Sequence, residues 1–194
     1  MQDILIQQLG DSIIAKKSLL TQKKNIFKAI KKISNSILKK NKILFCGNGG
    51  SASDAQHLTA ELLIRLRPNI NRKSIPAMSL VMDNSTLTAC SNDYSYDEVF
   101  SRPLSALGMN GDILIVISTS GTSKNIIKVL KTAKKMKIFS IGFLGKNGGH
   151  AKKFCDLPII VKSNITARIQ ESHIFLGHYI LEQVENILIK SKRY

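Results

Sequence analysis

The segment KILFCGNGGSASD, residues 42–54, joins a short apolar run to a loop rich in glycine and small polar residues. An apolar run that ends in glycines is typical of a buried parallel strand that leads into a loop. Helical periodicity follows from about Ser53 to Arg67. A strand, a glycine-rich turn and a helix in this order form the first half of a βαβ unit, and they predict an α/β fold.

Four further apolar runs have the length and composition of buried strands. They are Ala77–Val81, Asp112–Ser118, Phe139–Leu144 and Leu157–Val161. Helical segments near Asp97–Leu107 and Ser123–Met136 lie between them. Strands that alternate with helices predict a doubly wound parallel sheet, here with five strands.

The two ends of the chain are expected to be helical. Apolar residues recur at helical spacing in Ile4–Leu20 and Ile26–Leu38, which predicts two amphipathic helices arranged as a hairpin. A last helix over about Ala167–Lys190 has apolar residues in more than one stripe. Such a helix needs cover on two sides, so we expect it and the N-terminal helices to form contacts between subunits.

Length and composition indicate one globular domain, since 43% of the 194 residues are hydrophobic. We divide this domain, 1–194, into N-terminal helices at 1–40, an α/β core at 41–165 and a C-terminal helix at 166–194. No run approaches the roughly 18–20 apolar residues of a transmembrane helix, and the first residues do not resemble a signal peptide. We therefore expect a cytoplasmic protein with no membrane partner. Its three cysteines, Cys46, Cys90 and Cys155, have no paired spacing and should be reduced thiols.

A formal net charge of +16 raises the question of nucleic-acid binding. The excess is almost entirely lysine, spread as pairs over predicted helices without interleaved aromatic residues. We interpret this pattern as a solvated surface, and we expect no nucleic-acid partner.

The loop after the first strand is a candidate anion site, because backbone N–H groups and a helix N-terminus converge there. Its spacing Gly47-x-Gly49-x-x-Ala52 also fits a relaxed dinucleotide fingerprint, with Asp83 in the place of the ribose-binding acid. Against a dinucleotide, the loop carries hydroxyls at Ser51 and Ser53, which suit sugar or phosphate oxygens.

A second loop, ISTSGTSKN at 117–125, again ends a predicted strand and begins a helix. Five of its residues carry hydroxyls, and such a density predicts a cradle for a phosphate group. An ordinary turn capped by Thr122 or Ser123 would explain one or two of these hydroxyls.

His57 and Glu61 lie four residues apart and so share one face of the first helix after the glycine-rich loop. An imidazole and a carboxylate so placed can form a structural pair, bind a metal or transfer protons. The C-terminal helix adds Gln170, His173 and His178, of which we expect His173 to be structural or interfacial.

Four segments together resemble the sugar isomerase (SIS) domain family, and within it the phosphoheptose isomerases. They are CGNGGSASDAQHLTAEL, SNDYSYDEVF, ISTSGTSKN and ARIQESHIFLGH. The resemblance implies a flavodoxin-like domain in a homotetramer that converts sedoheptulose 7-phosphate into D-glycero-D-manno-heptose 7-phosphate. That reaction is the first step toward the nucleotide-activated heptose of lipopolysaccharide core or other surface glycans.

The resemblance also implies site residues. Glu61 matches the family's base and His178 its acid, whereas His57, Glu61, Gln170 and His178 match a zinc site, one ion per subunit. The implied substrate-binding residues are Asn48, Gly49, Gly50, Ser51, Glu61, Asn92, Asp93, Ser118, Thr119, Ser120, Ser123 and Gln170.

The zinc set raises a geometric question, because Gln170 and His178 are eight residues apart. In a regular helix their Cα atoms would be about 12 Å apart along the axis. We therefore expect either that Gln170 lies at the helix start with an irregular backbone or that the site gathers side chains from more than one subunit.

Two other functions are compatible with the SIS resemblance. Noncatalytic tetrameric relatives bind the bacterial replication initiator, but they lack the acid and the imidazole that stand here at Glu61 and His178. An isomerase of another ketose phosphate is the second alternative. We set aside SIS transcription regulators, because no DNA-binding module accompanies the domain.

Overall fold

A computed structural model describes residues 2–81, 83–192 and 194, and it contains a five-stranded, all-parallel sheet. The strands are β1 (Ile43–Gly47), β2 (Ala77–Ser79), β3 (Ile113–Ser118), β4 (Phe139–Gly145) and β5 (Leu157–Val161). Their order in the sheet is β2-β1-β3-β4-β5. The predicted doubly wound α/β class is therefore confirmed.

The neighbouring strands β1 and β3 mark the point where the chain changes direction across the sheet. The crossover from β1 leads to β2 on one side, whereas β3 continues through β4 to β5 on the other. In this strand order, ligands bind beyond the carboxyl ends of the strands at that switch point. Both polar loops noted in the sequence begin there, because they follow β1 and β3.

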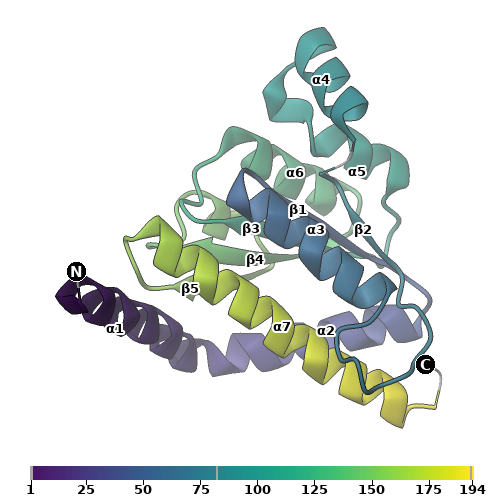
Figure 1. The fold of residues 1–194 in the computed structure, drawn as a ribbon. Helices are drawn as coiled ribbons and strands as arrows, with labels where there is room; N and C mark the ends of the chain where they lie inside the picture. Colours follow the sequence, from purple (N-terminus) through teal and green to yellow (C-terminus); the bar gives the residue numbers. More distant parts are fainter. Residues whose placement is uncertain (1, 82, 193) are drawn as a thin grey trace.

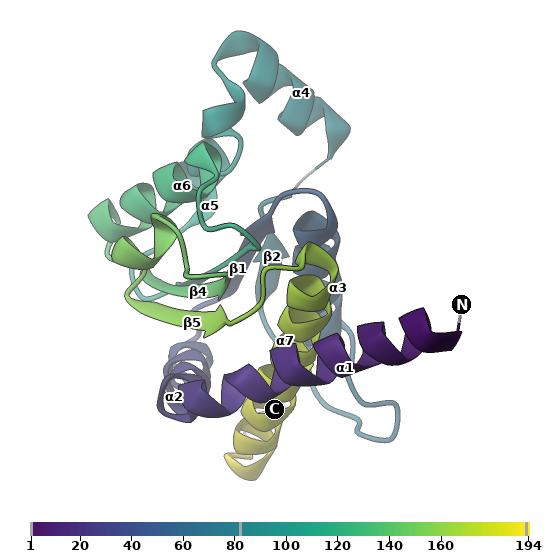
Figure 2. The same cartoon turned by 90° about the vertical axis from the view of Figure 1, so that its left-hand side faces the viewer.

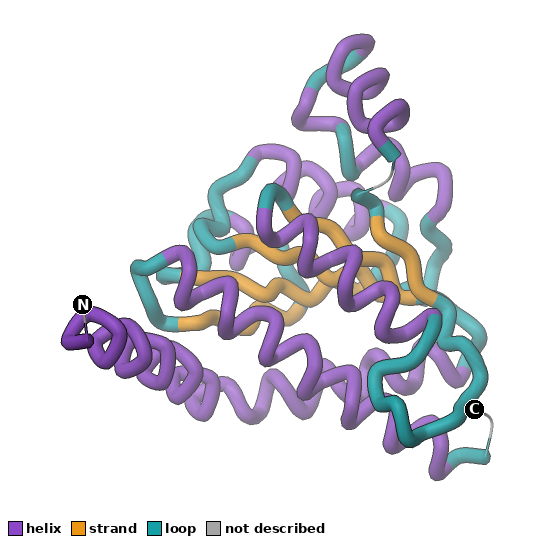
Figure 3. The backbone as a smooth tube through the Cα atoms, viewed as in Figure 1, coloured by secondary structure: helices purple, strands orange, loops and turns teal. Residues whose placement is uncertain are grey.

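Helices cover both faces of the sheet (Figures 1 and 2). One face carries α2 (Lys23–Leu38), α3 (Gly50–Leu63) and α7 (Thr166–Lys190), with α1 (Gln2–Ser18) lying across α7. The other face carries α5 (Ser101–Leu107) and α6 (Lys124–Lys135), and α4 (Asn84–Asp93) stands beyond them. Figure 3 shows the strands enclosed between these helical layers.

Side chains along β1 alternate between two hydrophobic cores. Ile43 and Phe45 belong to the core under α2, α3 and α7, whereas Leu44 and Cys46 belong to the core under α5 and α6. A strand buried on both faces reads as a continuous apolar run, which is why the sequence pattern located it.

The N-terminal helices do not form the expected hairpin. A 3-10 turn at Leu19–Gln22 joins α1 end to end with α2, and the two helices meet at an angle (Figure 2). Instead of packing on α2, α1 contacts α7 and β5. The junction contains no glycine or proline to reverse the chain, and Leu19 is buried there, so the helical path bends and continues.

Helix α4 was not predicted from the sequence. It buries Cys90 alone among its residues and so lacks an apolar stripe. Its start is fixed by Asp83, whose carboxylate accepts a hydrogen bond from the Thr86 N–H at 2.9 Å. The segment expected as one helix over 97–107 is divided into a 3-10 turn at Tyr96–Glu98 and α5.

The long connection from α3 to β2 is held by a buried ionic cluster. Glu185 of α7 accepts hydrogen bonds from the Nε atoms of Arg67 and Arg72, each at 2.6 Å. Arg72 also donates to the carbonyl oxygens of Leu62, at 2.9 Å, and Glu61, at 2.7 Å. The cluster therefore fixes the C-terminal end of α3 against α7.

No helix among residues 2–81, 83–192 and 194 is long and apolar enough to span a bilayer. The longest of them, α7, has Arg168, Glu171, Glu182 and Glu185 along its length.

We predict that Glu185→Gln lowers the free energy of unfolding by about 3 kcal/mol, because two guanidinium groups lose their charged partner in a buried site. Glu182→Gln is the matched control. Its side chain is 45% exposed and lies 3.6 Å from Arg67, so its loss should cost less than about 1 kcal/mol. Urea unfolding at one fixed protein concentration measures both, and equal losses would contradict the prediction.

Candidate functional site at the switch point

The glycine-rich loop brings the N-terminus of α3 directly against the end of β1. Gly49 has φ +57° and ψ −125°, a conformation that favours glycine. A Cβ at Gly47 would lie 2.4 Å from the carbonyl oxygen of Ser51. Because the turn is this tight, α3 begins directly beyond β1. The N–H groups of Ser51, Ala52 and Ser53 already donate to the carbonyl oxygens of Asn48 and Gly49, so an anion there would be favoured chiefly by the positive end of the helix dipole.

The second loop uses some of its hydroxyls to hold its own shape. The buried Ser118 hydroxyl accepts a hydrogen bond from the Gly121 N–H at 3.0 Å. The Ser120 hydroxyl accepts from the N–H and the hydroxyl of Thr122, at 3.2 and 3.0 Å. Ser123 stands at the N-cap of α6, but its side chain makes no capping bond. Neither Thr122 nor Ser123 therefore caps α6 through its side chain, and the Ser123 hydroxyl is not committed to the helix.

A reciprocal amide pair joins the two loops. Asn48 donates to the Asn125 side-chain oxygen at 2.9 Å, and Asn125 donates back to Asn48 at 2.9 Å. The Tyr96 hydroxyl also donates to Asn48, at 3.0 Å. Asn125 and Tyr96 were not among the predicted site residues, although both lie in segments that carry the family resemblance. Their proximity to Asn48 depends on the fold and has no local sequence signal.

Three of the predicted metal and catalytic residues, His57, Glu61 and His178, have their side chains next to one another. The Nε2 atoms of His57 and His178 are 2.9 Å apart, and His57 Nε2 lies 3.4 Å from Glu61 Oε1. Ligand atoms of all three residues lie within 4.8 Å of one another. Residues 121 positions apart are brought together because α3 packs against α7. The i, i+4 pair on α3 is thus part of a three-residue cluster.

Burial changes the acid–base character of the two histidines on α7. The pKa of His178 is lowered, first by desolvation and then by the nearby His57 charge. A His whose pKa is below its usual value is neutral at pH 7, and it offers a lone pair or a transferable proton. His173 is fully buried beside Phe143, and desolvation lowers its pKa to about 4. His173 is therefore a core residue in this chain, as expected.

Gln170 lies against the glycine-rich loop that follows β1. A Cβ built on Gly50 would be 2.4 Å from Gln170 Nε2, so the amide rests on the N-terminal turn of α3. The expected irregular backbone at Gln170 is wrong, because α7 is a continuous α-helix from Thr166 to Lys190 with neither glycine nor proline before Gln170. The expectation of a site that combines side chains from several subunits stays a prediction.

Asn92 and Asp93 occupy the last turn of α4, where both are exposed. Their side chains hydrogen-bond each other at 2.9 Å. Among the described residues, no side-chain hydrogen bond joins either of them to the two loops, although Tyr96, three positions on, reaches Asn48. Within the described part of a single chain, Asn92 and Asp93 therefore make no hydrogen bond to the cluster of His57, Glu61 and His178.

Asp83 has a structural role that conflicts with the dinucleotide alternative. Its carboxylate caps α4, and the Thr86 N–H and hydroxyl, both at 2.9 Å, lower its pKa. The cap explains why an acid stands at this position without a ribose ligand.

Comparison with known proteins supports the family resemblance seen in the sequence. The SIS domain model matches residues 11–145. A phosphoheptose isomerase from Clostridium acetobutylicum is 43% identical over 99% of this chain and 98% of its own length. One from Paramagnetospirillum magneticum is 52% identical over 79% of each chain.

A solved structure extends the likeness to three dimensions. A phosphoheptose isomerase from Francisella tularensis matches with a TM-score of 0.90 and 32% identity, over 95% of this chain and 98% of that one. Family model, sequence relatives and fold agree, and the chain belongs to the SIS domain family, among the phosphoheptose isomerases.

Proposed function

We propose that this protein is an aldose–ketose isomerase that converts sedoheptulose 7-phosphate into D-glycero-D-manno-heptose 7-phosphate. The observation that carries the proposal is the cluster of His57, Glu61 and His178 on helices α3 and α7. The same two helices meet at the glycine-rich loop, where Gln170 lies against Gly50. Its relatives supply the substrate class, since they are named phosphoheptose isomerases. We further propose that the product is made in the cytoplasm and supplies heptose for lipopolysaccharide core or another surface glycan.

The phosphate of the substrate is expected at the second loop. Ser123 and Thr119 can turn their hydroxyls to it, and the N-terminus of α6 adds backbone N–H groups. Binding at a group remote from the reacting carbons positions C1 and C2 without taking part in the chemistry. Ser118 and Ser120 belong to the same predicted cradle for the phosphate and the adjoining sugar oxygens. We assign the other sugar hydroxyls to the remaining predicted residues: Asn48, Gly49, Gly50, Ser51, Asn92, Asp93 and Gln170.

The reaction needs a base, an enediol intermediate and an acid. We propose that Glu61 removes the proton from the carbon beside the carbonyl and that His178 moves protons between the two oxygens. The lowered pKa of His178 suits this role, because a neutral imidazole can donate to a developing oxyanion. Triosephosphate isomerase uses the same pair of groups, a carboxylate base and a neutral imidazole.

The same cluster fits a zinc ion. Two imidazole nitrogens and a carboxylate are a common zinc donor set, and the buried Glu61 Oε2 has no hydrogen-bond partner. We propose that His57, Glu61 and His178 hold one zinc per subunit, with Gln170 as a fourth predicted ligand. When bound, zinc would supply Lewis acidity toward the carbonyl and hydroxyl oxygens of the sugar. Glu61 and His178 would each have two roles, so each would bind the metal through one atom, an oxygen or a ring nitrogen, and exchange protons through the other.

The function is tested by proton NMR of the purified protein with sedoheptulose 7-phosphate in deuterated water. We expect conversion to the aldose phosphate with deuterium at C2, because the enediol exchanges its proton with solvent. Treatment with a chelator should reduce the rate, and added zinc should restore it. Absence of conversion by folded, zinc-loaded protein would contradict the proposal. Conversion of another ketose phosphate in its place would favour the alternative substrate.

Glu61→Gln is the variant that isolates the base in that measurement. It preserves the shape of the side chain but cannot accept the proton, so exchange at C2 should disappear while circular dichroism and thermal stability are retained. His173→Ala is the comparison, since it should lower stability before it changes the chemistry. Deuterium incorporation by Glu61→Gln at the wild-type rate would remove Glu61 from the base role.

We predict that Ser123→Ala raises KM for the sugar phosphate by about tenfold, the value of one hydrogen bond to a charged group, with little change in kcat. The Ser123 side chain makes no capping bond, so its removal should leave α6 intact. Thr122→Ala is the matched control, because the Thr122 hydroxyl is committed to Ser120, and its KM should stay within about twofold. A loss of stability with unchanged KM would assign Ser123 to the helix start.

We propose that the protein is a homotetramer in which α1 and the outer side of α7 are buried between copies. Exposed large apolar side chains concentrate there, including Leu5 at 68%, Leu9 at 61% and Phe175 at 49%. An apolar surface of this kind usually marks an interface.

Leu5→Glu combined with Leu9→Glu should dissociate this assembly, because each copy then brings two carboxylates into the buried contact formed by α1. Met109→Glu, at a residue that is 68% exposed before β3, should leave the mass unchanged. Sedimentation velocity distinguishes the two. A wild-type protein that sediments as a monomer would overturn the tetramer without affecting the assignment of the reaction.

A further inference from the structure

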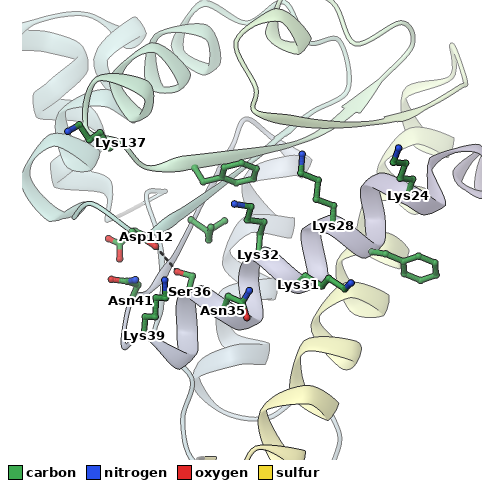
Figure 4. Close-up of a pocket in the computed structure, with 14 residues that line it drawn as sticks. Lys24, Lys28, Lys31, Lys32, Asn35, Ser36, Lys39, Asn41, Asp112 and Lys137 are labelled. Carbon is green, nitrogen blue, oxygen red and sulfur yellow. Dashed lines mark hydrogen bonds between the residues drawn. The ribbon is translucent and has the colours of Figure 1, made fainter.

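A hollow of about 680 Å³ lies at the amino ends of the strands, at the opposite edge of the sheet from the two loops. It is bounded by one side of α2 and by the segments that enter β1, β3 and β4 (Figure 4). The six residues of β3 separate it from the second loop, a span of about 20 Å at 3.3 Å per residue. This volume is within the range of about 300–1,000 Å³ that is usual for small-molecule sites.

Positive charge lines this hollow. Six lysines line it: Lys24, Lys28, Lys31 and Lys32 of α2, Lys39 at the C-cap of α2, and Lys137 before β4. In Figure 4 the side chains of Lys24, Lys28 and Lys32 project from the same side of α2. We call these six residues the lysine cluster. The opposite side of α2 is buried and apolar, so the lysines are collected on the exposed side by the amphipathic pattern of the helix.

The charge of the lysine cluster is not neutralised within the described chain. Helix α2 contains no acidic residue, and no carboxylate of the described residues lies within 4.0 Å of these six amino groups. The lining includes one acid, Asp112, which is buried and bound to Lys42 Nζ at 2.7 Å and to the Met109 N–H at 2.8 Å. Like charges at i, i+4 along α2 repel one another and destabilise the free helix. A bound anion would reduce this repulsion.

Two aromatic rings border the same hollow. Lys32 Nζ lies 4.9 Å from the centre of the Phe139 ring. Phe27 also lines the hollow, and its side chain is 52% exposed. A ring exposed to solvent beside ammonium groups offers a stacking surface next to a phosphate site.

We propose that this hollow binds a small molecule with a chain of two or three phosphates, of the nucleoside polyphosphate class. Lysines act as point charges toward phosphate, and Lys24, Lys28 and Lys32, each one helical turn from the next, match a chain of several phosphates better than a monophosphate. A concave site of limited volume favours a small molecule over a polymer, which would need an open track. The exposed Phe27 ring would contact the base. Because the sugar phosphate is expected at the other edge of the sheet, the two ligands do not compete.

The proposal is tested by isothermal titration calorimetry of the full chain at about 0.1 M salt, with ATP, ADP, AMP and inorganic tripolyphosphate as separate probes. ATP and tripolyphosphate should bind more tightly than ADP, and ADP more tightly than AMP. Lys24→Gln, Lys28→Gln and Lys32→Gln together should weaken ATP binding by about tenfold or more. Phe27→Ala should weaken ATP but not tripolyphosphate, which separates the base from the phosphates.

The control variant carries Lys134→Gln, Lys135→Gln and Lys152→Gln, which remove the same charge from exposed lysines outside the hollow. It should bind ATP within about twofold of wild type. Equal loss in both variants, equal affinity for AMP and ATP, or tighter binding of a long single-stranded RNA than of ATP would overturn the proposal. The rate of heptose isomerisation should be unchanged in the lysine variant, so failure of this site and failure of the proposed function are distinguishable.

Discussion

The hydrogen-bonded pair of Asn48 and Asn125 joins the two halves of the doubly wound sheet at their carboxyl end. Asn48 follows β1 and Asn125 lies in the first turn of α6, so the pair fixes the spacing of two loops that belong to different βαβ units. Adjacent parallel strands alone set the backbone separation but not the relation of the loops. The amide pair therefore determines where hydroxyls and helix N-termini can meet one ligand.

Helix α7 provides the second constraint, because it contributes to the site at one end and to stability at the other. Gln170 contacts the N-terminal turn of α3, and His178 contacts His57 in the middle of α3. Toward the end of α7, Glu185 binds Arg72, whose guanidinium donates to the carbonyl oxygen of Glu61. A rigid helix thus aligns with α3 along most of its length. The acid–base cluster lies between a polar contact and an ionic contact, which limits the relative sliding of the two helices.

The sequence pattern located the strands because they are buried on both faces and so form continuous apolar runs, and it located α7 because its apolar residues continue over a long helix. It missed α4, which buries only Cys90, and it misjudged the junction at Leu19, where direction depends on tertiary packing. Among the site residues, His57 and Glu61 were paired by local spacing alone. Their proximity to His178, and the partnership of Asn48 with Asn125 and Tyr96, connect distant segments, so only the fold or a family resemblance could indicate them.

The two edges of the sheet offer anions different chemistry. At the carboxyl edge, hydroxyls and helix N-termini present short, directional donors whose positions are set by tight turns, and such donors select one phosphate in one orientation. At the amino edge, long lysine side chains present charge without fixed geometry, and their attraction is screened by salt. The first arrangement favours a specific substrate, whereas the second responds to the number of charges on a ligand. One fold can therefore hold a sugar phosphate and a polyphosphate at opposite ends of β3 and distinguish them by geometry at one end and by charge at the other.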